Sequence, residues 1–196
     1  MAQTKAIKTA LISVFHKDGL SEILALLAKD GVKFLSTGGT RAFIEEQGYA
    51  CEAVEDLTGY PSILGGRVKT LHPKVFGGIL GRRSLESDMT TMAELAIPEI
   101  DLVIVDLYPF EQTVASGASH QDIIEKIDIG GISLIRAAAK NFADVAIVAS
   151  KGQYGMLRGF LEQHGAATTL EERTVLAREA FAVSSGYDSA IFDYMA

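Results

Sequence analysis

The clearest indication of the fold is the N-terminal segment AIKTALISVFHKDGLSEILALLAKDGVKFL, from Ala6 to Leu35. Residues 6–14 are mostly β-branched or apolar and predict a buried strand. Residues 21–29 repeat leucine and isoleucine at helical spacing, and residues 32–35 predict a second strand. A strand, a helix and a strand in such quick succession are typical of a parallel sheet that is covered by helices.

The same alternation continues, so the whole sequence predicts an α/β fold with a parallel sheet covered by helices. The further expected elements are helices at 40–47, 87–95, 132–139, 154–163 and 170–185, and strands at 49–54, 102–105 and 145–148. Residues 55–81 contain six glycines and two prolines, and they predict an irregular, functional segment. We interpret residues 1–196 as a single domain with a helical C-terminal tail, which stops as if at the boundary of a further domain.

Composition and charge exclude several classes of protein. Apolar residues make up 48% and charged residues 22% of the 196 positions, as in ordinary globular proteins. A net charge of −7 argues against partners such as nucleic acid or an anionic membrane surface, which need a basic face. No apolar run approaches the roughly 20 residues of a membrane span, and the N-terminal apolar run is too short and interrupted for a signal peptide. Cys51 is the only cysteine, so we expect a buried apolar filler in a cytoplasmic protein.

A glycine-rich turn, STGGT at residues 36–40, follows the second expected strand. Open α/β sheets bind ligands at the carboxyl ends of their strands. Gly38 and Gly39 let the backbone approach an anion, Thr37 and Thr40 add hydroxyl donors, and the next helix presents free amides. The alternative is a plain turn with Thr40 as helix N-cap. The turn matches neither the P-loop nor the GxGxxG pattern, which disfavours ATP and NAD.

The segment GGRVKTLHP, residues 65–73, places two cations in this otherwise acidic chain. In an extended loop Arg67 and Lys69 point to the same side and can converge with Thr70 on one phosphate or oxyanion. The alternative is a solvated loop with unrelated charges. His72 has no second histidine at metal-ligand spacing, so we assign no metal.

Three further positions complete the candidate chemistry. Asp128 in IDIGG stands between apolar residues, where a carboxyl group can have a raised pKa and exchange a proton; a helix N-cap is the alternative. Lys140 ends the alanine-rich helix RAAAKN, which could bring it to the same end of the sheet or leave it facing solvent. Tyr108 is restricted to an extended conformation by Pro109. Together these groups suit proton transfer and oxyanion stabilisation on a phosphorylated small molecule, without a Ser or Cys triad.

The motifs quoted above, together with LTGYP at 57–61, DLYPF at 106–110 and YDSAIFDY at 187–194, occur in an order that resembles one family. This family is the N-terminal domain of aminoimidazole-carboxamide ribonucleotide transformylase/IMP cyclohydrolase. The resemblance covers nearly the whole chain. It implies a methylglyoxal-synthase-like fold, a homodimer, and closure of the formylated ribotide to IMP with loss of water and no cofactor. The formyl-transferring domain of the family has no counterpart among these motifs.

The resemblance also implies a role for each matching residue. The phosphate-binding positions of the family correspond to Ser13, Lys17, Thr37, Gly38, Gly39, Thr40, Arg67 and Thr70. The catalytic residues of the family correspond to Lys69, Tyr108, Asp128 and Lys140. Asp128 is the candidate base. Each lysine is a candidate for stabilising the oxyanion or donating a proton, and we do not assign the two roles individually.

The chain departs from the family pattern at two places. Asp106 stands where the family commonly has Asn, and it could raise the pKa of Lys69 or Lys140 or face the sheet interior. Phe15 and His16 belong to SVFHKDG, which replaces the more usual SVSDKTG, so no contacts carry over to them. Two alternatives remain: methylglyoxal synthase, which RVKTLHP and RAAAKN disfavour, and a nucleotide-sensing module, which would bind nucleotide without converting it.

Overall fold

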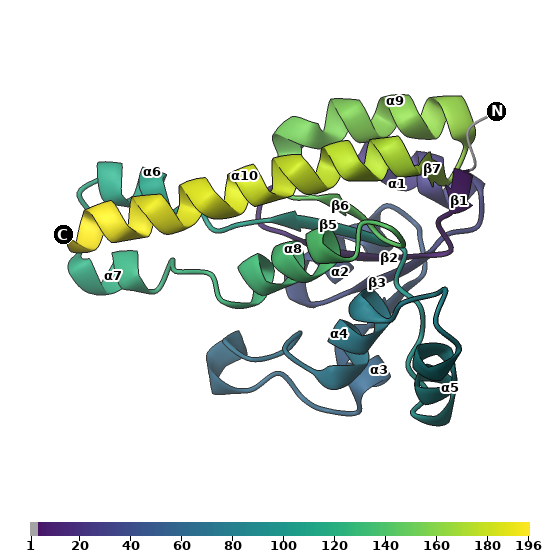
Figure 1. Ribbon diagram of the computed structural model, residues 1–196. Helices are drawn as coiled ribbons and strands as arrows, with labels where there is room; N and C mark the ends of the chain where they lie inside the picture. Colours follow the sequence, from purple (N-terminus) through teal and green to yellow (C-terminus); the bar gives the residue numbers. More distant parts are fainter. Residues whose placement is uncertain (1–3) are drawn as a thin grey trace.

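The computed structural model of this chain describes residues 4–196 and contains a central sheet of five parallel strands (Figure 1). The strands are β2 (Thr9–Val14), β3 (Lys33–Ser36), β4 (Cys51–Ala53), β5 (Leu102–Asp106) and β6 (Ala146–Val148), and their order is β4-β3-β2-β5-β6. Val14 lies opposite Asp106 in the register, so β2 and β5 end at the same level. The predicted fold class is confirmed.

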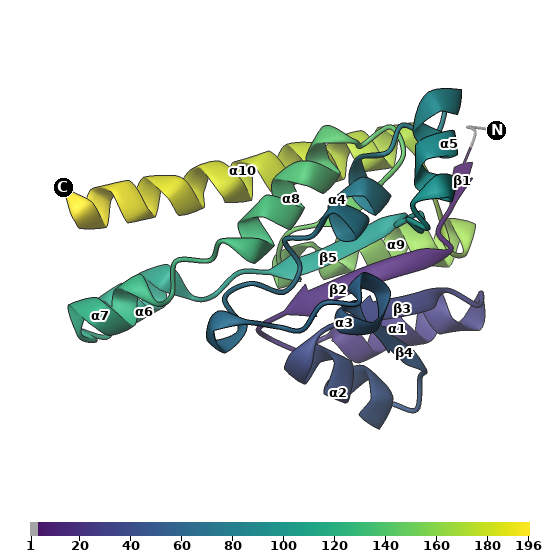
Figure 2. The same cartoon turned by 90° about the horizontal axis from the view of Figure 1, so that it is seen from below.

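Helices cover both faces of the sheet. On one face α1 (Leu20–Lys29) packs against α9 (Tyr154–His164), and on the other α4 (Pro73–Leu80) packs against α8 (Gly130–Lys140). In Figure 2, α4 and α8 lie in front of the strands and α1 and α9 behind them. The connection from β2 to β3 runs toward one edge of the sheet, and the connection from β5 to β6 runs toward the other edge. Because crossovers between parallel strands are right-handed, the helices of these two connections lie on opposite faces. The remaining sheet helix, α2 (Gly38–Glu46), packs beside β4.

Buried strands explain why the sheet is the core. Leu102, Val103 and Ile104 of β5 are completely buried, as continuous apolar runs in parallel sheets require. Cys51 is buried, as expected of an apolar filler, and burial raises the pKa of its thiol to about 11. No helix within residues 4–196 is long and apolar enough to cross a membrane.

The C-terminal helix is longer than its sequence pattern predicts. A capping box between Thr169 and Glu172 starts α10 (Leu170–Met195), which continues ten residues past the expected end at residue 185. Figure 1 shows its last turns beyond the sheet, flanked by α6 (Phe110–Ala115) and α7 (His120–Ile124). Phe110 packs edge-on against two tyrosines of α10, Tyr187 and Tyr194, which supports the extension.

Two other expectations need correction. The strand expected at 6–14 is two strands, since β1 (Thr4–Ala6) pairs antiparallel with β7 (Ala167–Thr169) outside the main sheet. The irregular segment 55–81 contains helices α3 (Val54–Thr58), η1 (Leu64–Gly66) and α4. Sequence reasoning missed α4 because glycine disfavours helices. The structure shows why glycine stands there: a Cβ on Gly78 would lie 2.5 Å from the Pro98 carbonyl oxygen, so the helix packs too closely for a larger residue. The other elements are α5 (Glu86–Glu94) and η2 (Lys151–Gln153).

Candidate functional site

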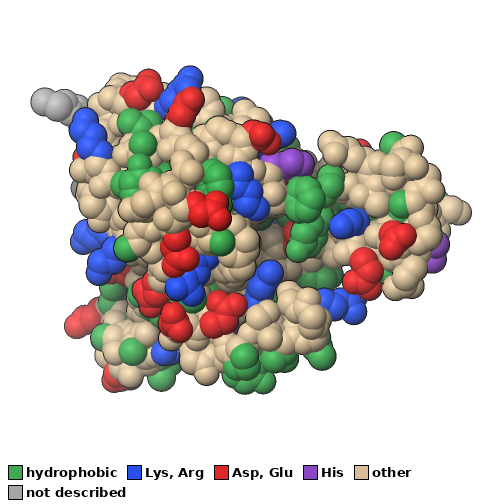
Figure 3. Space-filling model, turned by 180° about the vertical axis from the view of Figure 1, so that it is seen from behind, with side chains coloured by type: hydrophobic (Ala, Val, Ile, Leu, Met, Phe, Trp, Pro, Cys, Tyr) green, Lys and Arg blue, Asp and Glu red, His purple; other side chains and the backbone are tan. Residues whose placement is uncertain are grey.

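A cavity of about 430 Å³ opens at the carboxyl edge of the sheet. Figure 3 shows this face hollowed between the main body and the lobe formed by α6, α7 and the end of α10, with Lys and Arg side chains around the hollow. All predicted site residues except Lys140 line it: Ser13, Lys17, Thr37, Gly38, Gly39, Thr40, Arg67, Lys69, Thr70, Tyr108 and Asp128. Segments far apart in sequence therefore meet where the strands end.

The glycine turn presents the start of α2 to the cavity. Gly38 adopts a left-handed backbone conformation with φ of 49°, and it and Gly39 are exposed at the first turn of the helix, which contains no acidic residue. The helix N-cap is Thr37, not Thr40 as the alternative held. The Thr40 hydroxyl is buried, accepts from the Val14 amide at 3.2 Å and donates to the Val14 carbonyl at 3.0 Å. It joins α2 to β2, so the open donors toward an anion are backbone amides.

Two cations border the same end of the cavity in different ways. Lys17 donates from Nζ to the carbonyls of Val14 and Phe15 at 2.8 and 3.0 Å. Burial lowers the pKa of Lys17, and the nearby Asp106 carboxylate acts in the opposite direction. Arg67 is exposed and its Nη2 lies 3.7 Å from Oε1 of Glu125.

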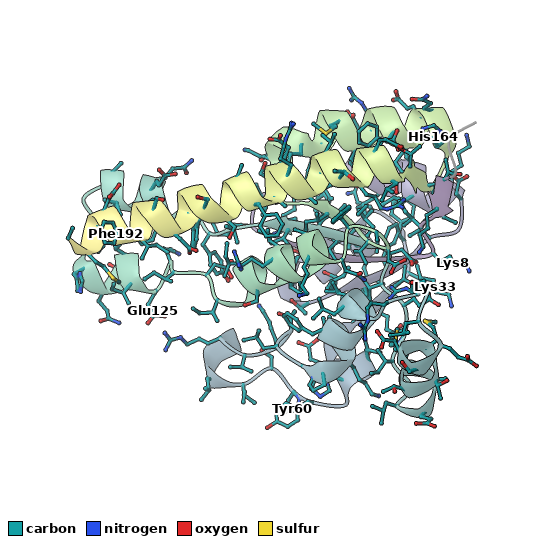
Figure 4. All side chains as sticks on the ribbon, in the orientation of Figure 1. Lys8, Lys33, Tyr60, Glu125, His164 and Phe192 are labelled. Carbon is teal, nitrogen blue, oxygen red and sulfur yellow. The ribbon has the colours of Figure 1, made fainter. Side chains whose placement is uncertain are left out.

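Glu125 belongs to the segment between α7 and α8, and Figure 4 shows it facing the loop that carries η1. The ion pair with Arg67 therefore spans the mouth of the cavity. An anionic ligand would compete with Glu125 for this guanidinium.

Asp128 is the carboxylate with the most perturbed surroundings in the cavity. Its Oδ1 accepts a hydrogen bond of 2.6 Å from the amide of Gly131, in the first turn of α8. Burial raises the pKa of Asp128, while the amides of Gly131 and Tyr108 and the charge of Lys69 act in the opposite direction. The N-cap residue of α8 is Ile129, so Asp128 is not the N-cap that one alternative held. Its carboxylate binds an amide of the first helical turn, and its pKa is raised, as the other alternative expected.

Sequence reasoning missed a side chain that holds Asp128 in place. The hydroxyl of Tyr187, on α10, accepts from the Asp128 amide at 2.7 Å and donates to the Lys126 carbonyl at 2.8 Å. Burial raises the pKa of Tyr187 to about 12, so it remains a neutral donor at neutral pH. Only its place in the motif YDSAIFDY could have drawn attention to it.

Tyr108 lines the cavity beside Phe15 and Lys126. Its ring is 39% exposed, packs edge-on against Phe15 with centroids 5.7 Å apart, and has Lys126 Nζ 5.7 Å from its centroid. Lys126 lines the cavity and was not among the predicted site residues.

The structure does not bring Lys140 to the cavity. Lys140 is the last residue of α8, whereas Gly130 and Gly131 at the start of that helix line the cavity. The two ends of an eleven-residue helix are about 15 Å apart, so Lys140 lies at the end of α8 that is distant from the cavity. Its side chain is exposed there. The alanines of RAAAKN pack against the sheet as expected, but they direct the chain away from the site. Among residues 4–196, no group of His, Cys, Asp and Glu side chains could hold a metal ion.

Comparisons with known proteins agree with this geometry. Residues 19–133 match the MGS-like domain family, and residues 138–196 match the AICARFT/IMPCHase bienzyme family. The chain is 71% identical over 194 residues to the bifunctional purine biosynthesis protein PurH of Bacteroides thetaiotaomicron, with 99% of this chain and 38% of that protein covered. It is 53% identical over 196 residues to PurH of Rhodopirellula baltica, with 100% of this chain and 37% of that protein covered. The chain thus spans less than two fifths of the length of these relatives.

Among solved structures, the crystal structure of ForH is similar, with a TM-score of 0.79 and 36% sequence identity. That similarity covers 98% of this chain and 100% of the ForH chain.

Proposed function

Because the chain belongs to the MGS-like domain family and matches the IMP cyclohydrolase part of the bifunctional purine biosynthesis proteins, we propose that it closes the formylated aminoimidazole-carboxamide ribonucleotide to IMP. The reaction forms a bond between the carboxamide nitrogen and the formyl carbon and releases water. The observation that carries the proposal is the meeting of Asp128, Lys69 and Tyr108 in one cavity beside the start of α2. The proposal includes a cytoplasmic homodimer without a cofactor, as the resemblance implies.

The phosphate of the ribotide suits the end of the cavity that α2 and Arg67 border. Free amides at the start of a helix attract anions because the helix dipole is positive there. Lys17 adds charge on the neighbouring loop, and the exposed Arg67 offers a bidentate donor. Binding the phosphate here would leave the imidazole ring to occupy the part of the cavity near Asp128.

Asp128 has the properties of a base for the first step. The carboxamide nitrogen is a poor nucleophile, and a carboxylate that accepts its proton during attack assists the step. Burial raises the pKa of Asp128, which makes it a stronger base than an exposed carboxylate. The Gly131 amide and Tyr187 fix its position, which matters because the reaction is intramolecular and depends on alignment.

Lys69 and Tyr108 suit the oxygen of the attacked formyl group. That oxygen gains negative charge and finally leaves as water, so it needs a cation and then a proton donor. Lys69 lies close enough to Asp128 to affect its pKa, and Tyr108 lines the same cavity. Lys140 has no part in this proposal.

Turnover of the formylated ribotide, followed by ultraviolet absorbance without folate or metal, tests the proposal. We expect conversion by the wild type, a loss of at least about 100-fold in kcat for Lys69→Ala, and no change for Lys29→Ala, an exposed lysine of α1. Binding of IMP without any conversion by the wild type would refute the cyclohydrolase and favour a nucleotide-sensing module.

A further inference from the structure

A pair of residues that the proposed chemistry does not use joins the loop after β2 to the end of β5, where Asp106 lines the cavity. His16 follows β2 and Asp106 ends β5, the neighbouring strand. Oδ2 of Asp106 accepts from the backbone amide of His16 at 2.8 Å and lies 2.6 Å from its ring Nδ1. One carboxylate oxygen thus binds both the backbone and the side chain of a single residue.

This contact is partly shielded from solvent. The Asp106 side chain is only 12% exposed and the His16 side chain 28%. With Nδ1 as donor, the imidazole has its proton on the nitrogen that faces Asp106. A partly buried, charge-assisted hydrogen bond of this kind restrains both partners more strongly than a surface ion pair does.

Aromatic contacts extend the restraint to Tyr108. The ring of Phe15 stands edge-on to His16 with centroids 4.9 Å apart, and edge-on to Tyr108 with centroids 5.7 Å apart. Phe15 and Tyr108 are both partly exposed, at 43% and 39%, so neither ring is fixed by burial alone. Their relative orientation therefore depends on what holds the Phe15–His16 segment.

We propose that His16 is a positioning residue, which acts through Asp106 and Phe15 to orient the phenol of Tyr108 in the cavity. This inference rests on the proposed function. Lys17, on the same loop, also donates to the Val14 carbonyl in β2, a contact that involves neither Phe15 nor His16, so we expect the pair to affect the orientation of Tyr108 more than the binding of the phosphate.

The test compares His16→Ala with His16→Asn, whose amide N–H can replace the Nδ1 donor. We expect His16→Ala to lower kcat about tenfold with KM nearly unchanged, and His16→Asn to recover most of the loss. In a Tyr108→Phe background, which lacks the phenol, His16→Ala should have no further effect on kcat. A change in KM alone, or an undiminished effect in the Tyr108→Phe background, would overturn the inference.

A second measurement does not depend on turnover. Fluorotyrosine incorporated at the six tyrosines gives ¹⁹F resonances, and the Tyr108→Phe variant identifies that of Tyr108. His16→Ala should shift this resonance, and His16→Asn should leave it near its wild-type position. If the Tyr108 resonance does not move in His16→Ala, the positioning role is refuted. If the resonance moves but the wild type shows no turnover, the proposed cyclohydrolase activity is refuted and the positioning role stands.

Discussion

Replacing Gly131 by alanine tests whether activity depends on the position of the Asp128 carboxylate. A Cβ on Gly131 would lie 2.8 Å from Oδ2 and 3.0 Å from Oδ1 of Asp128. Ordinary van der Waals contact requires the carboxylate to retreat by roughly half an ångström. That retreat stretches the 2.6 Å hydrogen bond from the Gly131 amide, which fixes the carboxylate in the native cavity.

The displacement should affect both rate and stability. If a misplacement of 1 Å costs about 100-fold, half that distance lowers kcat about tenfold. Weakening a hydrogen bond to a charged group costs about 1.5–3 kcal/mol of unfolding free energy, and alanine in a helix returns about 0.5–1 kcal/mol. The amide of Gly131 also opposes the rise in the pKa of Asp128. The acidic limb of the pH–kcat profile should therefore move to higher pH.

The assay is turnover of the formylated ribotide across pH, together with denaturant unfolding. Gly159→Ala is the matched control, because Gly159 lies within α9 and a Cβ there meets no atom within 4 Å. We expect this control to have wild-type kcat and to gain about 0.5–1 kcal/mol in stability. Wild-type kcat and an unshifted pH profile for Gly131→Ala would refute the role assigned to Asp128.

Three further changes have outcomes set by the same geometry. Asp128→Asn should abolish turnover yet raise Tm at pH 7. Burial raises the pKa of Asp128 in the folded protein, so the stability that this carboxyl group contributes is present below the ordinary carboxyl pKa and is lost as pH rises through the raised pKa of the folded state. The neutral Asn avoids that loss. Glu125→Gln should tighten IMP binding up to about fivefold at low ionic strength, because it releases Arg67 from an exposed ion pair. Tyr187→Phe should cost about 1–3 kcal/mol and lower kcat, because the Asp128 amide and the Lys126 carbonyl lose their partner.

Each of these outcomes has a specific contradiction. A lower Tm of Asp128→Asn at pH 7 would mean that the hydrogen bonds to the carboxylate outweigh its burial. Calorimetry that finds equal IMP affinity for Glu125→Gln would remove the competition at the mouth of the cavity. Tyr194→Phe serves as control for Tyr187→Phe, since the only hydrogen bond of the Tyr194 hydroxyl among the described residues is to the exposed His120.

The sequence predicted the five strands of the central sheet and, apart from Lys140, candidate residues that line the cavity, but it did not predict β7, α3, α4, α6 or α7. The buried runs of β2 and β5 and the glycines before α2 are encoded by adjacent residues, whose spacing and backbone preferences are local. The glycine turn after the second expected strand then indicated the edge of the sheet where a ligand would bind, because parallel strands bring their carboxyl ends to one edge.

Contacts between distant segments establish which of these groups meet and in what state. The tertiary structure placed Lys140 at the far end of α8, and it brought Tyr187, 59 positions along the chain, onto the amide of Asp128. It also turned the glycine-rich segment around residue 77 into a helix. Burial, pKa and hydrogen-bond partners arise from contacts between segments distant in sequence, and no local pattern specifies these contacts.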